Sequence, residues 1–148
     1  MNVYSKIFLA AIAGALASAI SMTLMGYLAA VTIPKEFFSW FQQSPNLGFV
    51  LLTSVQQILA YGLPLLAAGY LVVKRLSLAT GPALLSLLAG FWLYTIVGTA
   101  LIYQAPLQNP FAALSLPMVI MLTIHILFLA AGIALGKRYS QRISAENA

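Results

Sequence analysis

The feature that most constrains this chain is the segment from Ser44 to Arg75, SPNLGFVLLTSVQQILAYGLPLLAAGYLVVKR. No charged residue occurs between Glu36 and Lys74, and the basic pair at positions 74 and 75 then ends the apolar run. About 20 apolar residues, each adding about 1.5 Å of rise, cross a hydrocarbon layer of about 30 Å. Ser44 and Pro45 are typical of a helix start, because a hydroxyl caps free N–H groups and proline fits the first turn. The segment is therefore predicted to be a membrane-spanning helix.

The composition extends this prediction to the whole chain. Hydrophobic residues make up 62% of it and charged residues 6%, whereas soluble domains carry about 25% charged residues. A water-soluble protein of this size could not cover its surface with so few charged side chains. Lipid is therefore the expected solvent around the chain. The basic residues stand at segment ends without a dense block, which disfavours nucleic-acid binding. The absence of cysteine excludes disulfides, thiolate metal sites and cysteine nucleophiles.

Four apolar runs predict an all-α integral membrane protein with one domain of four transmembrane helices. The expected helices cover about 6–30, 45–73, 82–103 and 110–136, with an outer interfacial loop at 31–44 and a basic cytoplasmic tail at 137–148. The first run begins like a secretory signal, but it continues to Ile33 and is too long for a signal core. We expect a retained first helix. Pro64 and Pro117 lie inside or near helix starts and should kink or restart their helices.

The charges predict the orientation. Lys6 precedes the first helix, Lys74-Arg75 lies between the second and third, and Lys137, Arg138 and Arg142 follow the fourth. Lys35, beside Glu36, is the only basic residue of the other loops. The positive-inside rule therefore predicts both termini in the cytoplasm, and for a bacterial-type cell the inner (cytoplasmic) membrane as the location. The aromatic loop PKEFFSWFQQ is expected along the outer interface as a belt, with a lid or a docking surface as the alternative.

An echo within the chain favours two tandem helical hairpins. Ala67-Ala68-Gly69 precedes Lys74-Arg75 by the same spacing as Ala130-Ala131-Gly132 precedes Lys137-Arg138. Two copies in the same orientation would be related by an axis along the membrane normal. Chance similarity among segments rich in alanine, leucine and glycine is the competing explanation.

Small residues predict where helices pack. Ala10, Gly14 and Ser18 recur every fourth residue, and a second series, Ala11, Ala15 and Ala19, follows another face of the first helix. Gly132 and Gly136 form a GxxxG pattern in the fourth helix. Such spacing lets backbones approach closely, which matters because lipid gives no hydrophobic drive between helices. Closure of the four-helix bundle is one interpretation, and contact with another membrane helix is the other.

Polar residues at similar depth predict a layer in the middle of the membrane. Its expected members are Gln57, Tyr61, Tyr94 and His125. An ionisable residue at this depth is a site hypothesis by default. The competing interpretation is a neutral His125 that is hydrogen-bonded to Gln57, Tyr61 or Tyr94 and stabilises the bundle.

The sequence gives little support for a metal site or a bound cofactor, and we predict neither. One histidine supplies one haem ligand, so bis-histidine ligation would need a symmetric dimer. Met118, Met121 and His125 share a face that suits Cu(I), with Met22 and Met25 at similar depth, but methionine is also an ordinary core residue. The two carboxylates, Glu36 and Glu146, lie outside the apolar runs, so paired acids and Asp-based triads are excluded there. An enzyme is therefore not expected, with a redox or lipid-modifying role as the weakest alternative.

Two functions remain. The first is a non-catalytic accessory or partner-binding subunit of a membrane assembly, in contact with the bilayer and with another membrane protein or a second copy of itself. The second is a small oligomeric carrier or pore for a neutral or apolar solute, with the polar layer around His125 facing the pathway.

Overall fold

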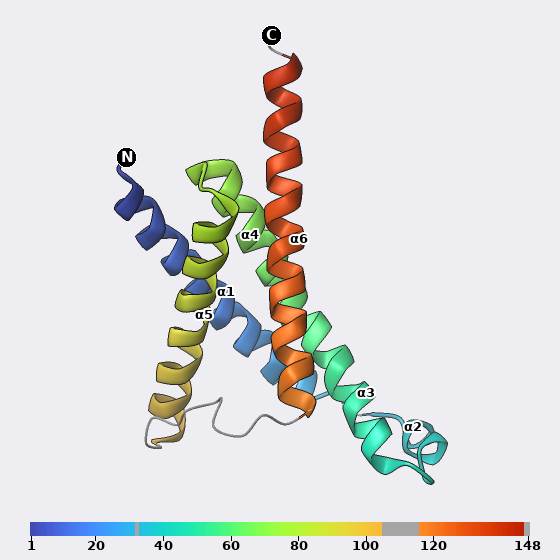
Figure 1. Cartoon of the computed structure of the whole chain (residues 1–148). Coiled ribbons are helices and arrows are strands. Elements are labelled where there is room, and N and C mark those ends of the chain that lie inside the picture. The colour runs from blue at the N-terminus through green and yellow to red at the C-terminus, as the bar shows by residue number, and fades with distance from the viewer. Residues whose placement is uncertain (32, 105–115, 147–148) are drawn as a thin grey trace.

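The computed structural model describes residues 1–31, 33–104 and 116–146, and within them all regular structure is helical (Figure 1). Four helical segments are long and apolar enough to cross a membrane: Val3–Ala29, Pro45–Leu76, Thr80–Leu101 and Met118–Arg142. The predicted all-α class with four such spans is confirmed. The predicted third loop and the helix start at Asn109-Pro110 lie outside the described residues.

Helix α1 covers Val3–Ala29 and α5 covers Thr80–Tyr103. The side-chain oxygen of Asn2 caps α1 by accepting from the backbone N–H of Ser5 at 2.8 Å. Helix α5 ends at Gln104, which adopts a left-handed conformation with φ of 48°. Both helices therefore lie within a few residues of their predicted limits.

The second span is interrupted. Helix α3 (Pro45–Gln57) passes into a π-helical turn, η1 (Ile58–Gly62), and then into α4 (Leu63–Leu76). Pro64 has no N–H to donate to the carbonyl of Ala60, and its ring crowds that carbonyl. The proline that was predicted to kink the helix thus stands directly after a widened turn. Pro45 begins α3 as predicted, but the expected cap is wrong, because the Ser44 side chain makes no capping hydrogen bond.

The fourth span belongs to the longest helix, α6 (Leu116–Glu146). It continues past Gly136, where the helix was predicted to end, so most of the predicted tail at 137–148 is helical. The stretch KRYSQRISAE has no glycine or proline and contains good helix formers. Its charges end the apolar span without ending the helix.

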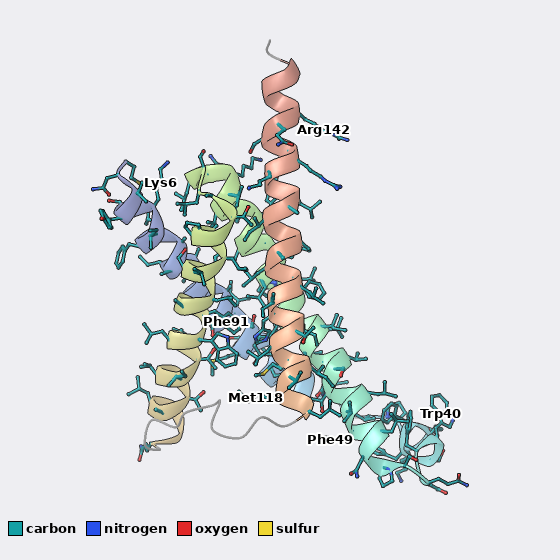
Figure 2. The ribbon with its side chains drawn as sticks, viewed as in Figure 1. Lys6, Trp40, Phe49, Phe91, Met118 and Arg142 are labelled. Atoms are coloured by element: carbon teal, nitrogen blue, oxygen red, sulfur yellow. The ribbon has the colours of Figure 1, made fainter. Side chains whose placement is uncertain are left out.

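The loop at 31–44, which was predicted to lie outside, contains a short helix, α2 (Lys35–Trp40), and the aromatic side chains of this loop pack against one another and against α3. The ring centroids of Phe37 and Phe41 are 5.1 Å apart. A Cβ built on Gly48 of α3 would lie 2.8 Å from the Phe41 side chain, so only glycine admits this ring. In Figure 2 Trp40 and Phe49 lie at the end of the molecule opposite Lys6 and Arg142.

The spans pack mainly as two crossed pairs, α1 with α5 and α4 with α6. Each pair joins helices that run in the same direction, as the colours of Figure 1 show. The start of α1, the turn between α4 and α5 and the end of α6 lie at one end of the molecule. The tightest contacts join the first span to the third and the second to the fourth, and the tandem hairpins stay a prediction.

Glycine makes both crossings possible. A Cβ on Gly14 would overlap the carbonyl of Leu87, and a Cβ on Gly90 would overlap the carbonyl of Ala11. Backbones this close leave room for hydrogen alone, so α1 and α5 meet along bare main chain. Beside this crossing lies the buried core, which includes Phe91, near the centre of the molecule in Figure 2.

The α4–α6 crossing is built in the same way. A Cβ on Gly132 would overlap the Leu66 carbonyl, and one on Gly69 would lie 2.7 Å from the Leu129 carbonyl oxygen. A Cβ on Gly136 would lie 2.8 Å from the Tyr70 carbonyl oxygen. The two echoed glycines, at positions 69 and 132, therefore face each other's helix.

Candidate functional site

The His125 side chain lies in a box of aromatic rings where three elements meet. It comes from α6 and is 1% exposed. Its ring centroid is 4.8 Å from that of Phe91 and 5.6 Å from that of Trp92, both on α5. Tyr61, from the π-helical turn η1, lies at 4.9 Å. The imidazole therefore lies among three aromatic rings of the apolar spans, in edge-type and tilted arrangements.

Several buried polar atoms of the spans, those of His125 among them, lack hydrogen-bond partners in the described part of the chain. Among the described residues neither Nδ1 nor Nε2 of His125 has a hydrogen bond, and Oε1 of Gln57 and Oγ of Ser21 also have none. A neutral imidazole carries one donor and one acceptor. Each buried group left unpaired costs about 1–3 kcal/mol. Such groups call for an explanation such as a bound water, a ligand or a change of conformation.

The hydrogen bond expected from His125 to Gln57, Tyr61 or Tyr94 is therefore wrong. His125 meets Tyr61 ring to ring, and neither nitrogen of its imidazole has a hydrogen-bond partner among the described residues. Gln57 is buried in the last turn of α3. Tyr94 is 42% exposed and lines a groove between α1 and α5, so its environment differs from that of the box.

A narrow cleft adjoins Gln57. Its lining residues are Val50, Thr53, Ser54, Gln57 and Ile120, and its volume is about 10 Å³. Thr53 and Ser54 already donate to backbone carbonyls one turn earlier, at 2.8 and 2.7 Å. One water needs roughly 10–15 Å³ and several polar neighbours, so the cleft lies at the lower limit for a single water.

The π-helical turn carries Tyr61 into the box. Single π turns within α-helices are often found at functional sites, because the extra residue redirects the side chains around it. Sequence reasoning placed Pro64 correctly but did not identify the π turn. It also missed Phe91 and Trp92, because aromatic residues in an apolar helix give no sign of which way they face.

A polar link joins α1 and α5 beside the box. The hydroxyls of Ser18 and Thr95 are 2.8 Å apart, and Thr95 also lies 2.9 Å from the Phe91 carbonyl oxygen, to which it can donate. Ser18 is fully buried, whereas the equally buried Ser21 has no hydrogen-bond partner within residues 1–31, 33–104 and 116–146. The predicted packing residues Gly14, Ser18, Gly132 and Gly136 all face neighbouring helices of the same chain. Gly69 and Gly90, which complete the two crossings, were not predicted as packing residues.

An apolar groove of about 570 Å³ lies between α1 and α5 on the exposed side of their crossing. Small residues form part of its lining: Ala11, Ala15, Gly90 and Gly98. Large residues form the remainder: Phe8, Ile12, Leu93, Tyr94, Val97 and Leu101. The second small-residue series of α1 therefore contributes to this groove, while the first series is buried against α5.

The described parts of the chain contain no group of three or more His, Cys, Asp or Glu side chains that could hold a metal ion.

Comparisons with protein-family models, with curated proteins and with solved structures gave no match. The functional proposal therefore depends on the groove between α1 and α5 and on the aromatic box around His125.

Proposed function

We propose that this chain is a non-catalytic, multi-pass protein of the inner membrane that binds a transmembrane helix of another membrane protein. The groove between α1 and α5 is the docking surface. The predicted packing glycines, Gly14, Gly132 and Gly136, suggested partner binding, but each of them already packs against a neighbouring helix of the same chain. A partner must therefore use a different surface.

Helix α1 has two series of small residues, and this proposal is supported by the series that faces the open groove while the other series is buried against α5. Ala11 and Ala15 are one turn apart on α1 and line the groove together with Gly98 of α5. Among the described residues, a Cβ on Gly98 would meet only the Tyr94 ring, at 3.6 Å, so no other described helix covers this glycine within 4 Å. Membrane helices associate through close packing at such small residues.

The shape of the groove favours a helix as the occupant. Its α5 side extends from Gly90 to Leu101, which is about three turns or roughly 16 Å at 1.5 Å per residue. Bulky side chains at Phe8 and Leu101 form parts of its lining, as ridges that a helix can pack against. The Tyr94 hydroxyl supplies a polar group for a hydrogen bond across the interface.

The distribution of charge supports the orientation with both termini in the cytoplasm. Six basic residues precede, connect or follow the spans at the end that holds the chain termini: Lys6, Lys74, Arg75, Lys137, Arg138 and Arg142. Lys35 on α2, at the opposite end, is accompanied by Glu36. The positive-inside rule assigns the first set to the cytoplasmic side.

The test is affinity purification from native membranes in a mild detergent. Ala15→Leu and Gly98→Leu each fill the groove, and each should lose the co-purifying partner while the protein stays monodisperse. Gly26→Leu is the matched control, because a Cβ on Gly26 meets nothing within 4 Å and Gly26 lies outside the groove. Gly14→Leu is unsuitable, since it would break the α1–α5 crossing. A wild-type protein that purifies as a lone monomer, or groove variants that keep the partner, would contradict the proposal.

A second candidate function is a small carrier or pore for a neutral or apolar solute. The unpaired polar atoms of Ser21, Gln57 and His125 favour it, because they come from three of the four spans and offer hydrogen bonds to a passing solute. The described spans hold no carboxylate, which disfavours coupling to a cation.

A further inference from the structure

A basic groove lies along α6 near the end that holds both chain termini. Its volume is about 770 Å³. Its lining residues are Tyr70 from α4 and Leu135, Arg138, Tyr139, Gln141 and Arg142 from α6. We propose that this groove binds the phosphate headgroup of an anionic phospholipid. The site is separate from the docking groove between α1 and α5.

The two arginines call for an anion between them. Arg138 and Arg142 are four residues apart on α6, so their side chains leave the same face of the helix. Like charges at this spacing repel each other. Of the two acidic residues in the chain, Glu36 lies on α2 at the opposite end of the molecule. The other, Glu146, stands one turn after Arg142 but two turns after Arg138, which has no acidic residue within four positions on α6. Guanidinium groups bind phosphate oxygens through paired hydrogen bonds, which suits a phosphate at this position.

A third cation is held at the edge of the groove. The ammonium of Lys74 lies 4.1 Å from the centroid of the Tyr139 ring and donates to the Tyr70 hydroxyl at 3.2 Å. The rings of Tyr70 and Tyr139 contact edge to face with centroids 6.1 Å apart. These contacts fix the position of a flexible lysine beside two tyrosines that line the groove. The groove therefore combines three positive charges with two tyrosine rings.

The surroundings favour a lipid over free phosphate. The groove lies where the apolar span Met118–Arg142 ends, so a molecule bound there reaches both the aqueous phase and the hydrocarbon. Leu135 adds an apolar side chain on the membrane side. Tyrosine is typical of this level of the bilayer, and basic pockets between helices on the cytoplasmic side bind anionic headgroups.

The experiment follows thermal unfolding of the purified full chain in an uncharged detergent at fixed ionic strength. Short-chain phosphatidylglycerol, phosphatidylcholine and inorganic phosphate are titrated separately. Phosphatidylglycerol should raise the unfolding midpoint in a saturable way, and the other two should have little effect. Arg138→Gln with Arg142→Gln should weaken the apparent affinity by roughly 30-fold, since each basic side chain near the surface contributes about a fivefold factor. Both side chains are exposed, so the variant is expected to fold.

The matched control is Lys6→Gln with Arg75→Gln. It removes the same charge from the same end of the molecule but does not alter the lining of the groove. This control should retain affinity within about threefold. An equal loss in the control would overturn the proposal, because it would show general attraction to a basic surface. An equal response to phosphatidylcholine or to inorganic phosphate would overturn it too, since neither supplies an anionic lipid headgroup.

Discussion

Single residues in the middle of the spans differ in whether their polar atoms are paired. Ser18 and Thr95 share a hydrogen bond of 2.8 Å across the α1–α5 crossing. Ser21, one turn later on α1, is equally buried and has no hydrogen-bond partner in the described part of the chain. The same holds for both nitrogens of His125, which lie among aromatic rings. In lipid no bulk water satisfies such groups, so they lower stability unless the native protein binds something there.

The His125→Leu variant tests this at the residue scale. Leucine fills a similar volume without polar atoms, so the melting temperature in detergent should rise, by an amount equivalent to about 1–3 kcal/mol. The control Ser18→Ala removes a formed hydrogen bond and should lower stability by about 0.5–1.5 kcal/mol. If the chain acts as a carrier, His125→Leu should also abolish solute uptake at normal expression. A destabilised His125→Leu protein would instead show that the imidazole has a partner in the native state.

At the scale of helices, the two crossings are reciprocal. In one, Gly14 meets Leu87 and Gly90 meets Ala11; the spacing between Gly14 and Gly90 equals that between Ala11 and Leu87. In the other, Gly69 meets Leu129 and Gly132 meets Leu66, again with equal spacing. Each pair of parallel helices therefore crosses with local two-fold character. This is the relation that two copies about an axis along the membrane normal would give.

Two glycines of α5 allow a matched test of the first crossing. In Gly90→Ala the added Cβ would overlap the Ala11 backbone, so the variant should lose roughly 1–3 kcal/mol of stability as α1 and α5 separate. In Gly98→Ala the new Cβ makes ordinary contact, and stability should be unchanged or rise by up to about 1 kcal/mol. Thermal unfolding in detergent measures both. Equal behaviour of the two variants would mean that α1 and α5 do not approach as described.

At the scale of the whole molecule, most of the basic residues lie at the end opposite the loop of phenylalanine and tryptophan residues around α2. Lys6 and Arg142 lie at one end, and Trp40 and Phe49 lie at the other (Figure 2). Lys137 donates a hydrogen bond to the Thr80 hydroxyl, so the basic end of α6 is linked to the start of α5. Lys137, one of the basic residues that the positive-inside rule uses to predict orientation, therefore also takes part in a contact between helices.

Labelling of single cysteines tests the proposed orientation, because the chain has no cysteine of its own. A membrane-impermeant maleimide should label Ser44→Cys in intact cells. It should label Ser77→Cys, in the turn after α4, only once the membrane is permeabilised. The two positions lie at opposite ends of the second span, so they serve as controls for each other. The reverse pattern would place both chain termini outside.

The sequence by itself determined the all-helical class and the four segments that are long and apolar enough to cross a membrane, with their approximate limits, because apolar length and charge are local properties of a segment. It also identified Gly14, Gly132 and Pro64 as special positions, since small residues and proline act through the backbone. It did not predict that Gly90 and Gly69 complete the crossings, or that Tyr94 leaves the layer that holds His125. Those outcomes depend on the rotation of each helix about its axis. Only tertiary packing sets that rotation, because in lipid an apolar side chain is accepted on any face.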